Sequence, residues 1–392
     1  MEDRAEPTLV VYGAGNIGRG IVSLLFLQAG YRLQFYRRNV QALLEMQTKG
    51  GYVIHSQSPA RTMGMTTPVR EFEVLTGERA LIQALADTDL MACCIYPTAF
   101  QDAARILACA VCHRAKVGIG QPLNVLLCCN EPMGSGQLQA LLQSELDRLG
   151  CPALTAQVGI VPVAVYSVGF HPETGGPYDV AVSEHGYLDG DKAAFLGEPV
   201  RIPGLHWVDG VEARLYRKLY LGNLFHTLAA VYGAEKGYQR IGQCYGDRKI
   251  RTQITAAFAE SEAAVLRTWH FDEKEHRQWR EMMLRKMQVP SQDEVDRVIR
   301  DLRRKLGREE RLIGPILLCL QQKLPSFDLV VGAAAALSRL AQEQTDFAEA
   351  FAGNPADAVA QVCGLKKSEP TEKRLLEQIV RHMQCRLDEK NG

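Results

Sequence analysis

Three polar residues interrupt the apolar and aromatic segment RKLYLGNLFH at residues 217–226. In this segment Lys218 carries an amine, Asn223 an amide and His226 an imidazole. A lysine can act as a general base when burial disfavours its charged form, an amide can stabilise a developing alkoxide, and a histidine can orient a hydroxyl. Together these groups could remove the proton from an alcohol that loses a hydride.

The spacing of these residues supports this interpretation if the segment is a helix. Because an α-helix advances about 100° per residue, Gly222, His226 and Asn223 would lie at about 40°, 80° and 140° from Lys218. The polar side chains would then share one arc, where the glycine leaves room for a ligand. The alternative is a lysine that extends to solvent and two polar side chains that are satisfied inside a core.

A glycine-rich loop near the start of the chain, YGAGNIGRG, predicts a second binding element. Gly13, Gly15 and Gly18 have the G-x-G-x-x-G spacing between a predicted strand and a predicted helix, as a dinucleotide-binding loop requires. The first glycine allows the tight turn, the second lets the backbone approach a pyrophosphate, and the third lets the helix pack close to the sheet. A glycine turn in an unrelated α/β protein is the alternative. The expected cofactor-binding residues of the loop are Gly13, Ala14, Gly15, Asn16, Ile17 and Gly18.

Two arginines follow the second predicted strand, in the sequence QFYRRN. An NAD site usually has an acidic residue about 20 positions after the loop, which accepts a hydrogen bond from the ribose 2′-hydroxyl. Arg37 and Arg38 stand there instead, and a planar guanidinium suits a 2′-phosphate. The sequence therefore favours NADP(H) over NAD(H); two solvated arginines that tolerate NAD are the alternative.

The elements that would position these groups change character along the chain. Strands alternating with helices predict a mostly parallel sheet covered on both faces, whereas from Val211 onward the periodicity is almost entirely helical. We therefore predict an α/β fold, with a Rossmann-type, mostly parallel sheet domain at residues 1–204 and a mainly α-helical domain at residues 205–392. The predicted strands are residues 9–12, 32–36, 71–75, 90–96, 124–130 and 156–167, with further strands in YDVAVSEHG and PVRIPG.

The overall composition is that of a globular protein. The formal net charge is zero, which argues against a nucleic-acid or membrane-surface partner, and no apolar run reaches the roughly 18 residues of a membrane span. The charged first residues lead directly into a strand, so we expect a cytoplasmic protein without a secretory signal. No H-E-x-x-H and no paired C-x-x-C spacing indicates a metal site. Nothing suggests an obligate interface, and we expect a monomer.

The eleven cysteines predict reduced thiols in this setting. CAVCH, at residues 109–113, has the c-type haem attachment spacing, but it lies in an amphipathic helix pattern of a chain with no export signal. Helix packing is the preferred interpretation, and a redox-active pair is the alternative. The cysteine pairs at 93–94 and 128–129 are interpreted as small core residues at the ends of buried strands.

Five segments read in order carry a resemblance to a known family: YGAGNIGRG, RKLYLGNLFH, DRKIR, ERLIGPIL and GAAAAL. With these, the chain resembles the polyol-specific long-chain dehydrogenase/reductase family over nearly its whole length, and its size suits the short, phosphate-using branch. The motif K-x-x-x-x-N-x-x-H is specific to this family. The resemblance implies a metal-independent oxidoreductase that interconverts an open-chain polyol phosphate and a ketose phosphate with a nicotinamide cofactor.

The resemblance also implies a role for each site residue. It implies Lys218 as the general base and Asn223 and His226 as groups that hold the substrate. A further asparagine of the family, at the end of a sheet strand, corresponds to Asn130 in CCNEPMGSGQL, where it would share the stabilisation of the substrate oxygen.

Three positions depart from the family pattern. Cys129 replaces an acid before the strand-end asparagine, Tyr166 and Ser167 replace an Asp-Arg pair, and Arg37 replaces the aspartate usual in the dehydrogenases for mannitol phosphate. The first two departures put the substrate in doubt. The same chemistry on an unphosphorylated polyol, a sugar acid or a sugar–amine conjugate is one alternative, and an NADP(H)-binding sensor without turnover is another.

Overall fold

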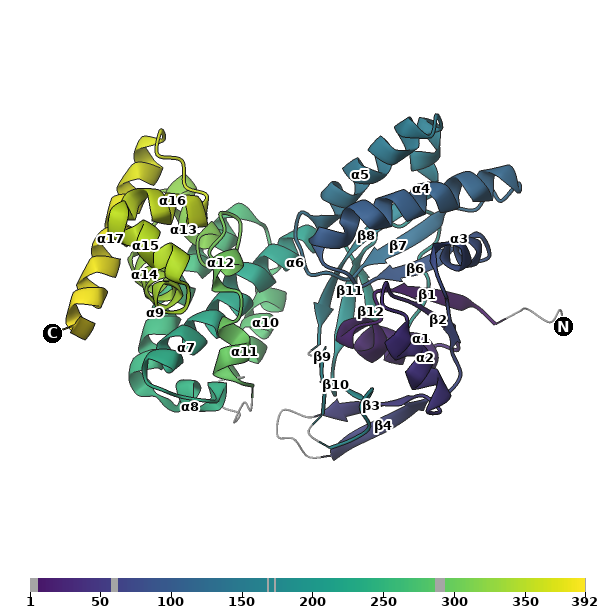
Figure 1. The fold of residues 1–392 in the computed structure, drawn as a ribbon, viewed down its shortest axis with the longest axis horizontal. Helices are drawn as coiled ribbons and strands as arrows, with labels where there is room; N and C mark the ends of the chain where they lie inside the picture. Colours follow the sequence, from purple (N-terminus) through teal and green to yellow (C-terminus); the bar gives the residue numbers. More distant parts are fainter. Residues whose placement is uncertain (1–5, 58–62, 168, 173, 286–292, 392) are drawn as a thin grey trace. The chain divides into compact units, whose positions relative to one another are not determined.

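The computed structural model describes residues 6–57, 63–167, 169–172, 174–285 and 293–391 (Figure 1). The chain divides into two compact units, Met1–Leu215 and Tyr216–Gly392. This division falls after residue 215 rather than after residue 204, for two reasons. Strand β12 (Leu205–Val208) pairs with the sheet of the first unit, and α6 (Val211–Arg217) packs Val211 and Leu215 against Ala164 of that sheet.

The first unit is built on an eight-stranded sheet in the order β12-β11-β8-β7-β6-β1-β2-β5. Every neighbouring pair is parallel except β8 and β11, so the predicted mostly parallel sheet is confirmed. The central strands of the sheet are buried along nearly their whole length because helices cover both faces of the sheet. The remaining strand bounds are β1 (Thr8–Tyr12), β2 (Arg32–Tyr36), β5 (Glu73–Val74), β6 (Leu90–Cys93), β7 (Leu123–Leu127), β8 (Val158–Tyr166) and β11 (Tyr187–Asp191).

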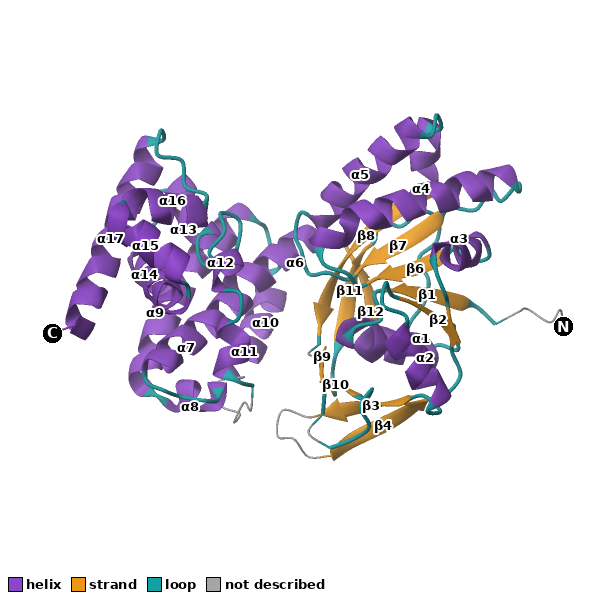
Figure 2. Cartoon of the chain, in the orientation of Figure 1, coloured by secondary structure: helices purple, strands orange, loops and turns teal. Residues whose placement is uncertain are grey.

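Helices cover both faces of this sheet (Figure 2), and a separate hydrophobic cluster fills each face. One cluster lies under α1 (Ser23–Gln28) and α2 (Gln41–Thr48). The other lies under α3 (Glu78–Ala86), α4 (Phe100–Lys116) and α5 (Gly134–Arg148), and α4 and α5 run side by side. The CAVCH segment is therefore part of a packed helix, as predicted.

A second, four-stranded sheet was not predicted from the sequence. Its order is β4-β3-β10-β9, and it joins the hairpin of β3 (Tyr52–Gln57) and β4 (Met63–Val69) to β10 (Val180–Ser183) and β9 (Gly169–Phe170). The strand predicted in PVRIPG is wrong, because residues 199–204 are irregular and the strand begins at Leu205. The two prolines of that segment have no N–H to donate to a ladder.

The second unit is helical throughout its described part. Helix α9 contacts α7, α13 and α14, and α14 also packs against α17. No helix in the described ranges is long and apolar enough to cross a membrane. The helix bounds are α7 (Leu224–Glu235), α8 (Ile241–Gly246), α9 (Arg248–Thr268), α10 (Glu273–Arg285), α11 (Val295–Ile299), α12 (Leu302–Lys305), α13 (Gly314–Gln322), α14 (Phe327–Glu343), α15 (Thr345–Gly353), α16 (Pro355–Cys363) and α17 (Pro370–Asn391).

Candidate active site

The glycine loop connects β1 to a helix that starts with a π-turn, η1 (Gly18–Val22), and continues as α1. Two of its glycines are sterically required. Gly13 has φ +95°, and a Cβ atom there would lie 2.4 Å from the carbonyl oxygen of Cys94. A Cβ atom on Gly18 would lie 2.7 Å from the carbonyl oxygen of Gly13 and 2.9 Å from Val11. These contacts hold the turn and the helix start against β1 and β6.

Gly15 differs from Gly13 and Gly18 because no heavy atom lies within 4 Å of its ideal Cβ position. The open space above this residue is what the close approach of a pyrophosphate to the backbone requires. Ala14 is buried, Ile17 packs against the core, and the Asn16 amide donates to the Gly169 carbonyl at 3.3 Å. The loop therefore has the shape of a dinucleotide cradle, in which packing fixes the walls and Gly15 leaves the opening.

The two predicted arginines lie directly after β2. Arg37 is half-buried, whereas the Arg38 side chain is 71% exposed and its nearest carboxylate, Asp102 at the start of α4, is 3.5 Å away. An ion pair this exposed contributes little stability. Both guanidinium groups therefore lie at the end of β2. The side chain of Arg38 is only weakly restrained by its ion pair with Asp102.

Arg19 is a site residue that the sequence analysis missed. Its Nε donates to the carbonyl of Ala14 at 3.0 Å, a second nitrogen donates to the carbonyl of Tyr178, and the guanidinium lies 5.5 Å from the Tyr52 ring centroid. Burial lowers the pKa of Arg19, and the Arg37 charge adds to this effect. Arg19 thus anchors the loop at Ala14, and its charge adds to the positive charge of Arg37 at the end of β2. Its only signal in the sequence is an arginine directly after the third glycine.

Tyr96 is a second residue that the sequence did not indicate. It follows β6 next to Ile95, whose side chain reaches the Gly13 turn, yet Tyr96 is 81% exposed. An exposed aromatic ring at the carboxyl end of a parallel strand lies where open α/β sheets bind ligands.

Asn130 lies just beyond β7 in a left-handed conformation, with φ +55°. Asparagine tolerates this region better than most residues. Its Oδ1 accepts a hydrogen bond from the N–H of Val165 at 2.9 Å. The carbonyl oxygen of the amide therefore accepts from the backbone of β8, and Nδ2 is the donor atom of this amide.

The departures at Cys129 and at Tyr166 and Ser167 remove the charges of the family pattern. Burial raises the pKa of the Cys129 thiol to about 12, so a neutral group replaces the expected acid. Tyr166 stacks on Tyr187 with ring centroids 4.6 Å apart, and the Ser167 hydroxyl accepts from the N–H of Ser183 at 3.1 Å. The Asp-Arg pair has thus been replaced by side chains with packing and backbone contacts.

In the second unit, the segment of Lys218 is a π-turn, η4 (Lys218–Asn223), and not the α-helix assumed from the sequence. The N–H of Leu224 donates to the carbonyl of Leu219, five residues back. Because one turn holds an additional residue, Asn223 completes the turn that Lys218 begins and does not lie about 140° away. π-Turns occur frequently at functional sites.

The burial pattern of this segment agrees with the predicted notch. Lys218, Gly222, Asn223 and His226 are partly exposed, while the apolar side chains between them are buried. The ideal Cβ position of Gly222 has a single neighbouring atom within 4 Å, Cζ2 of Trp279 at 3.9 Å. The turn therefore presents an amine and an amide around an uncrowded glycine.

A buried arginine anchors the beginning of the π-turn. Arg217 is 1% exposed, and its two terminal nitrogens lie 3.1 and 2.8 Å from the carboxylate oxygens of Glu275. Its guanidinium also lies 4.6 Å from the Phe271 ring and 4.8 Å from the Trp279 ring. Since Trp279 also faces Gly222, α10 contacts both ends of the turn.

The middle of the π-turn is anchored through Tyr220. The buried Ser261 hydroxyl donates to the Tyr220 carbonyl at 2.8 Å, and the Tyr220 hydroxyl donates to the Glu309 carbonyl at 3.2 Å. Gly314 leaves space for this ring, because a Cβ atom there would lie 2.5 Å from the Tyr220 oxygen. The bond from Ser261 supplies one of the partners that an irregular helical turn needs.

His226 follows the π-turn, and both of its ring nitrogens have protein partners. Nδ1 lies 2.9 Å from the Tyr245 hydroxyl, and Nε2 lies 3.0 Å from Oδ2 of Asp293. Burial alone would raise the pKa of Asp293, but hydrogen bonds from His226 and Arg297 hold this pKa well below its usual range. The imidazole is therefore fixed by a tyrosine and a carboxylate, and neither partner was predicted from the sequence.

Replacing Asp293 by asparagine is expected to destabilise the second unit by about 2 kcal/mol at pH 7, through loss of charge-assisted hydrogen bonds. Because the pKa of Asp293 is lower in the folded state, its contribution is complete above an unfolded-state pKa of about 4 and is lost as the pH falls below that value. Thermal unfolding of both proteins between pH 7 and pH 3 measures the difference, which should shrink on acidification. Asp296→Asn, at an exposed position nearby, is the matched control. A pH-independent difference would contradict the prediction.

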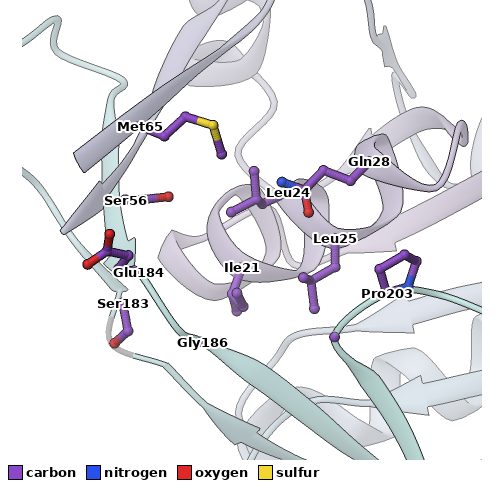
Figure 3. A pocket seen from close by; sticks show the side chains of 11 residues that line it. Ile21, Leu24, Leu25, Gln28, Ser56, Met65, Ser183, Glu184, Gly186 and Pro203 are labelled. Carbon is purple, nitrogen blue, oxygen red and sulfur yellow. The ribbon is translucent and has the colours of Figure 1, made fainter. Parts of the chain in front are cut away.

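The cavity seen in Figure 3 is a separate feature of the first unit. It measures about 220 Å³ and lies between α1, which contributes Leu24, Leu25 and Gln28, and the segments around Ser56 and Glu184. None of the predicted site residues lines it. Within the described ranges, no group of three or more histidine, cysteine or acidic residues is arranged to hold a metal ion.

The predicted residues fall into two groups, one in each unit. The first unit holds the glycine loop, Arg37, Arg38 and Asn130, and the second holds Lys218, Asn223 and His226. Asn130 is held by Val165, and His226 is held by Tyr245 and Asp293, in each case within one unit.

Two protein-family models match the chain. The mannitol dehydrogenase Rossmann domain matches residues 7–184, and the mannitol dehydrogenase C-terminal domain matches residues 210–384. The first match includes the glycine loop and Asn130, and the second includes the π-turn.

Solved structures with the same fold include several dehydrogenases and reductases. Pseudomonas fluorescens mannitol 2-dehydrogenase, in a ternary complex with NAD and D-mannitol, is 13% identical with a TM-score of 0.76, over 97% of this chain and 92% of that chain. A D-sorbitol dehydrogenase in substrate-free form is 13% identical with a TM-score of 0.66, over 86% and 81%. A PanE/ApbA family ketopantoate reductase from Ralstonia eutropha JMP134 is 17% identical with a TM-score of 0.53, over 84% and 97%.

Proposed function

The chain belongs to the mannitol dehydrogenase family, and from this premise we propose that it interconverts an open-chain polyol phosphate and the corresponding ketose phosphate, with Lys218 as general base. The pair we propose is mannitol 1-phosphate and fructose 6-phosphate, the substrates of a mannitol-1-phosphate 5-dehydrogenase. The observation that carries the proposal is the π-turn, which presents Lys218 and Asn223 around the uncrowded Gly222.

Each residue has a chemical task in this proposal. When the polyol is oxidised, the Lys218 amine accepts the proton of the reacting hydroxyl, and in the reverse direction it returns that proton. The amides of Asn223 and Asn130 donate to the substrate oxygen as negative charge develops on it. His226 is fixed by Tyr245 and Asp293, and its ring helps to hold the substrate next to the π-turn. The nicotinamide cofactor, held at the glycine loop, supplies the hydride exchange when bound.

The proposal is tested by a grid of cofactors and substrates on purified protein. NADPH and NADH are each combined with fructose 6-phosphate, free fructose, a keto sugar acid and a fructose–amine conjugate, and cofactor oxidation is followed. A kcat/KM for fructose 6-phosphate at least tenfold above that of the other compounds is expected. Equal or higher activity on an unphosphorylated compound would reject the phosphate specificity and leave the base chemistry in place.

An unphosphorylated substrate is the second candidate because of three specific positions. The neutral Cys129, Tyr166 and Ser167 lie near Asn130 in the fold of the first unit, where charged residues were expected. The loss of an arginine weakens the case for a phosphate group. A sensor without turnover is the third candidate, and it predicts tight NADPH binding with no oxidation in any well of the grid.

We further propose that the cofactor is NADP(H), because Arg37, Arg38 and Arg19 surround the end of β2 with positive charge. Arg37→Asp combined with Arg38→Ala is expected to lower the NADPH to NADH ratio of kcat/KM by about 30-fold, equivalent to about 2 kcal/mol of lost charge-assisted hydrogen bonding. Arg32→Asp, at the exposed opposite end of β2, serves as the control. An unchanged ratio in the double variant would show that these arginines do not contact the ribose phosphate.

A further inference from the structure

Two cysteines of the first unit face each other at the junction of three helical elements. Cys112 lies on α4, and Cys151 lies between α5 and the 3₁₀ helix η3 (Pro152–Gln157). Their sulfur atoms are 2.7 Å apart, which approaches the covalent sulfur–sulfur distance of about 2.05 Å. Both residues are partly exposed.

The two thiols border an open cavity of about 560 Å³, so a small reagent can reach them. Cys109, His113 and Lys116 line the same cavity. The pair that the CAVCH motif suggested, Cys109 and Cys112, lies on successive turns of one helix. A bond between those two would join α4 only to itself, whereas Cys151 belongs to a different element.

We propose that Cys112 and Cys151 form a reversible intramolecular disulfide when the protein meets a peroxide. In the first step one thiolate attacks a peroxide oxygen and becomes a sulfenic acid, with release of one water from hydrogen peroxide. The second thiol then attacks the sulfenic sulfur, the sulfur–sulfur bond forms, and a second water leaves. Two thiols lose two electrons and two protons in total, and one hydrogen peroxide is reduced to two waters.

Five of the other cysteines are less accessible to a peroxide. Cys93, Cys128, Cys244, Cys319 and Cys363 are buried. Burial, together with the hydrogen bond to Cys151, raises the pKa of the Cys112 thiol to about 11. The reaction is therefore slow at neutral pH and should accelerate about tenfold per pH unit over the range in which the Cys112 thiolate is scarce.

The bond would close the chain between α4 and η3, which includes β7 and the whole of α5. Such a cross-link restricts the unfolded chain and should raise the melting temperature of the first unit by roughly 5 °C. Cys112 lies ten residues after Asp102, the α4 residue next to Arg38, which is about 15 Å along the helix. We therefore expect oxidation to change cofactor binding by less than twofold.

The test uses the full-length protein, first reduced and then treated with excess hydrogen peroxide at pH 7 and pH 9. Remaining thiols are alkylated, and the peptides are mapped by mass spectrometry with and without dithiothreitol. A dithiothreitol-sensitive peptide that links Cys112 to Cys151, formed faster at pH 9, is the expected result. Cys109→Ser should retain this link and the rise in melting temperature, while Cys112→Ser and Cys151→Ser should lose both.

Two results would overturn the proposal. One is a folded, oxidised parent protein in which Cys112 and Cys151 are both recovered as alkylated thiols or as higher oxides. The other is a dominant link between a different pair, such as Cys109 and Cys112. Because the mapping is performed on the parent protein, neither result depends on whether a variant folds.

Discussion

Lys218→Ala is expected to lower kcat by about 10³-fold while the protein remains folded, because general base catalysis contributes roughly this factor. The amine is the only group of the π-turn that can accept a proton from the substrate hydroxyl, since Asn223 is an amide and both ring nitrogens of His226 have protein partners. The measurement is steady-state turnover with the preferred pair of substrate and cofactor. Melting temperature and NADPH affinity should stay close to those of the parent.

Chemical rescue separates the loss of a base from a structural effect. A small primary amine added to Lys218→Ala should restore part of the turnover, and more of it as the pH rises and the added amine loses its proton. Lys236→Ala is the matched control, because Lys236 lies in the same unit and pairs with Asp247 outside the π-turn. Turnover of Lys218→Ala within tenfold of the parent would show that the base assignment is wrong.

Arg217→Met is expected to destabilise the second unit by about 3 kcal/mol, which corresponds to roughly 8 °C in melting temperature. The substitution removes a buried bidentate ion pair with Glu275 and the contacts of the guanidinium with Phe271 and Trp279. Because Lys218 is the next residue, kcat should fall by at least about tenfold. NADPH affinity should be unchanged, since the predicted cofactor-binding residues lie in the other unit.

A double-mutant cycle makes this second prediction sharper. Glu275→Gln leaves a buried guanidinium, which cannot lose its proton, without its anion. We expect this variant to be at least as unstable as Arg217→Met, while the double variant should be more stable than the sum of the two losses predicts. Purely additive losses would show that the pair is not coupled, and an unchanged kcat in Arg217→Met would show that Arg217 does not position the π-turn.

The parts that the sequence predicts well are those with local causes. Gly13 and Gly18 are required by contacts with β1, β6 and the loop itself, so their spacing after an apolar run is informative. The α/β domain and the helical domain were predicted because the hydrophobic period changes once along the chain. The burial of the apolar residues between Lys218 and His226 follows from the same periodicity.

The parts that the sequence does not reveal depend on distant residues. Asp293 lies 67 positions from His226, and no local pattern connects them. The small second sheet joins β3 to β10, whose positions in the chain are also far apart. The π-turn depends on Ser261 and Gly314, which accommodate Tyr220 from two other helical segments. Only tertiary structure brings such partners together.

The one additional residue in the π-turn changes the phase of everything that follows it. An uninterrupted α-helix from Val211 to Glu235 would have more regular backbone bonding. With the same residues, however, that helix would turn His226 by about 100° around the helix axis, away from Tyr245 and Asp293. Backbone regularity and side-chain orientation are in conflict along this segment, and the fold keeps the orientation.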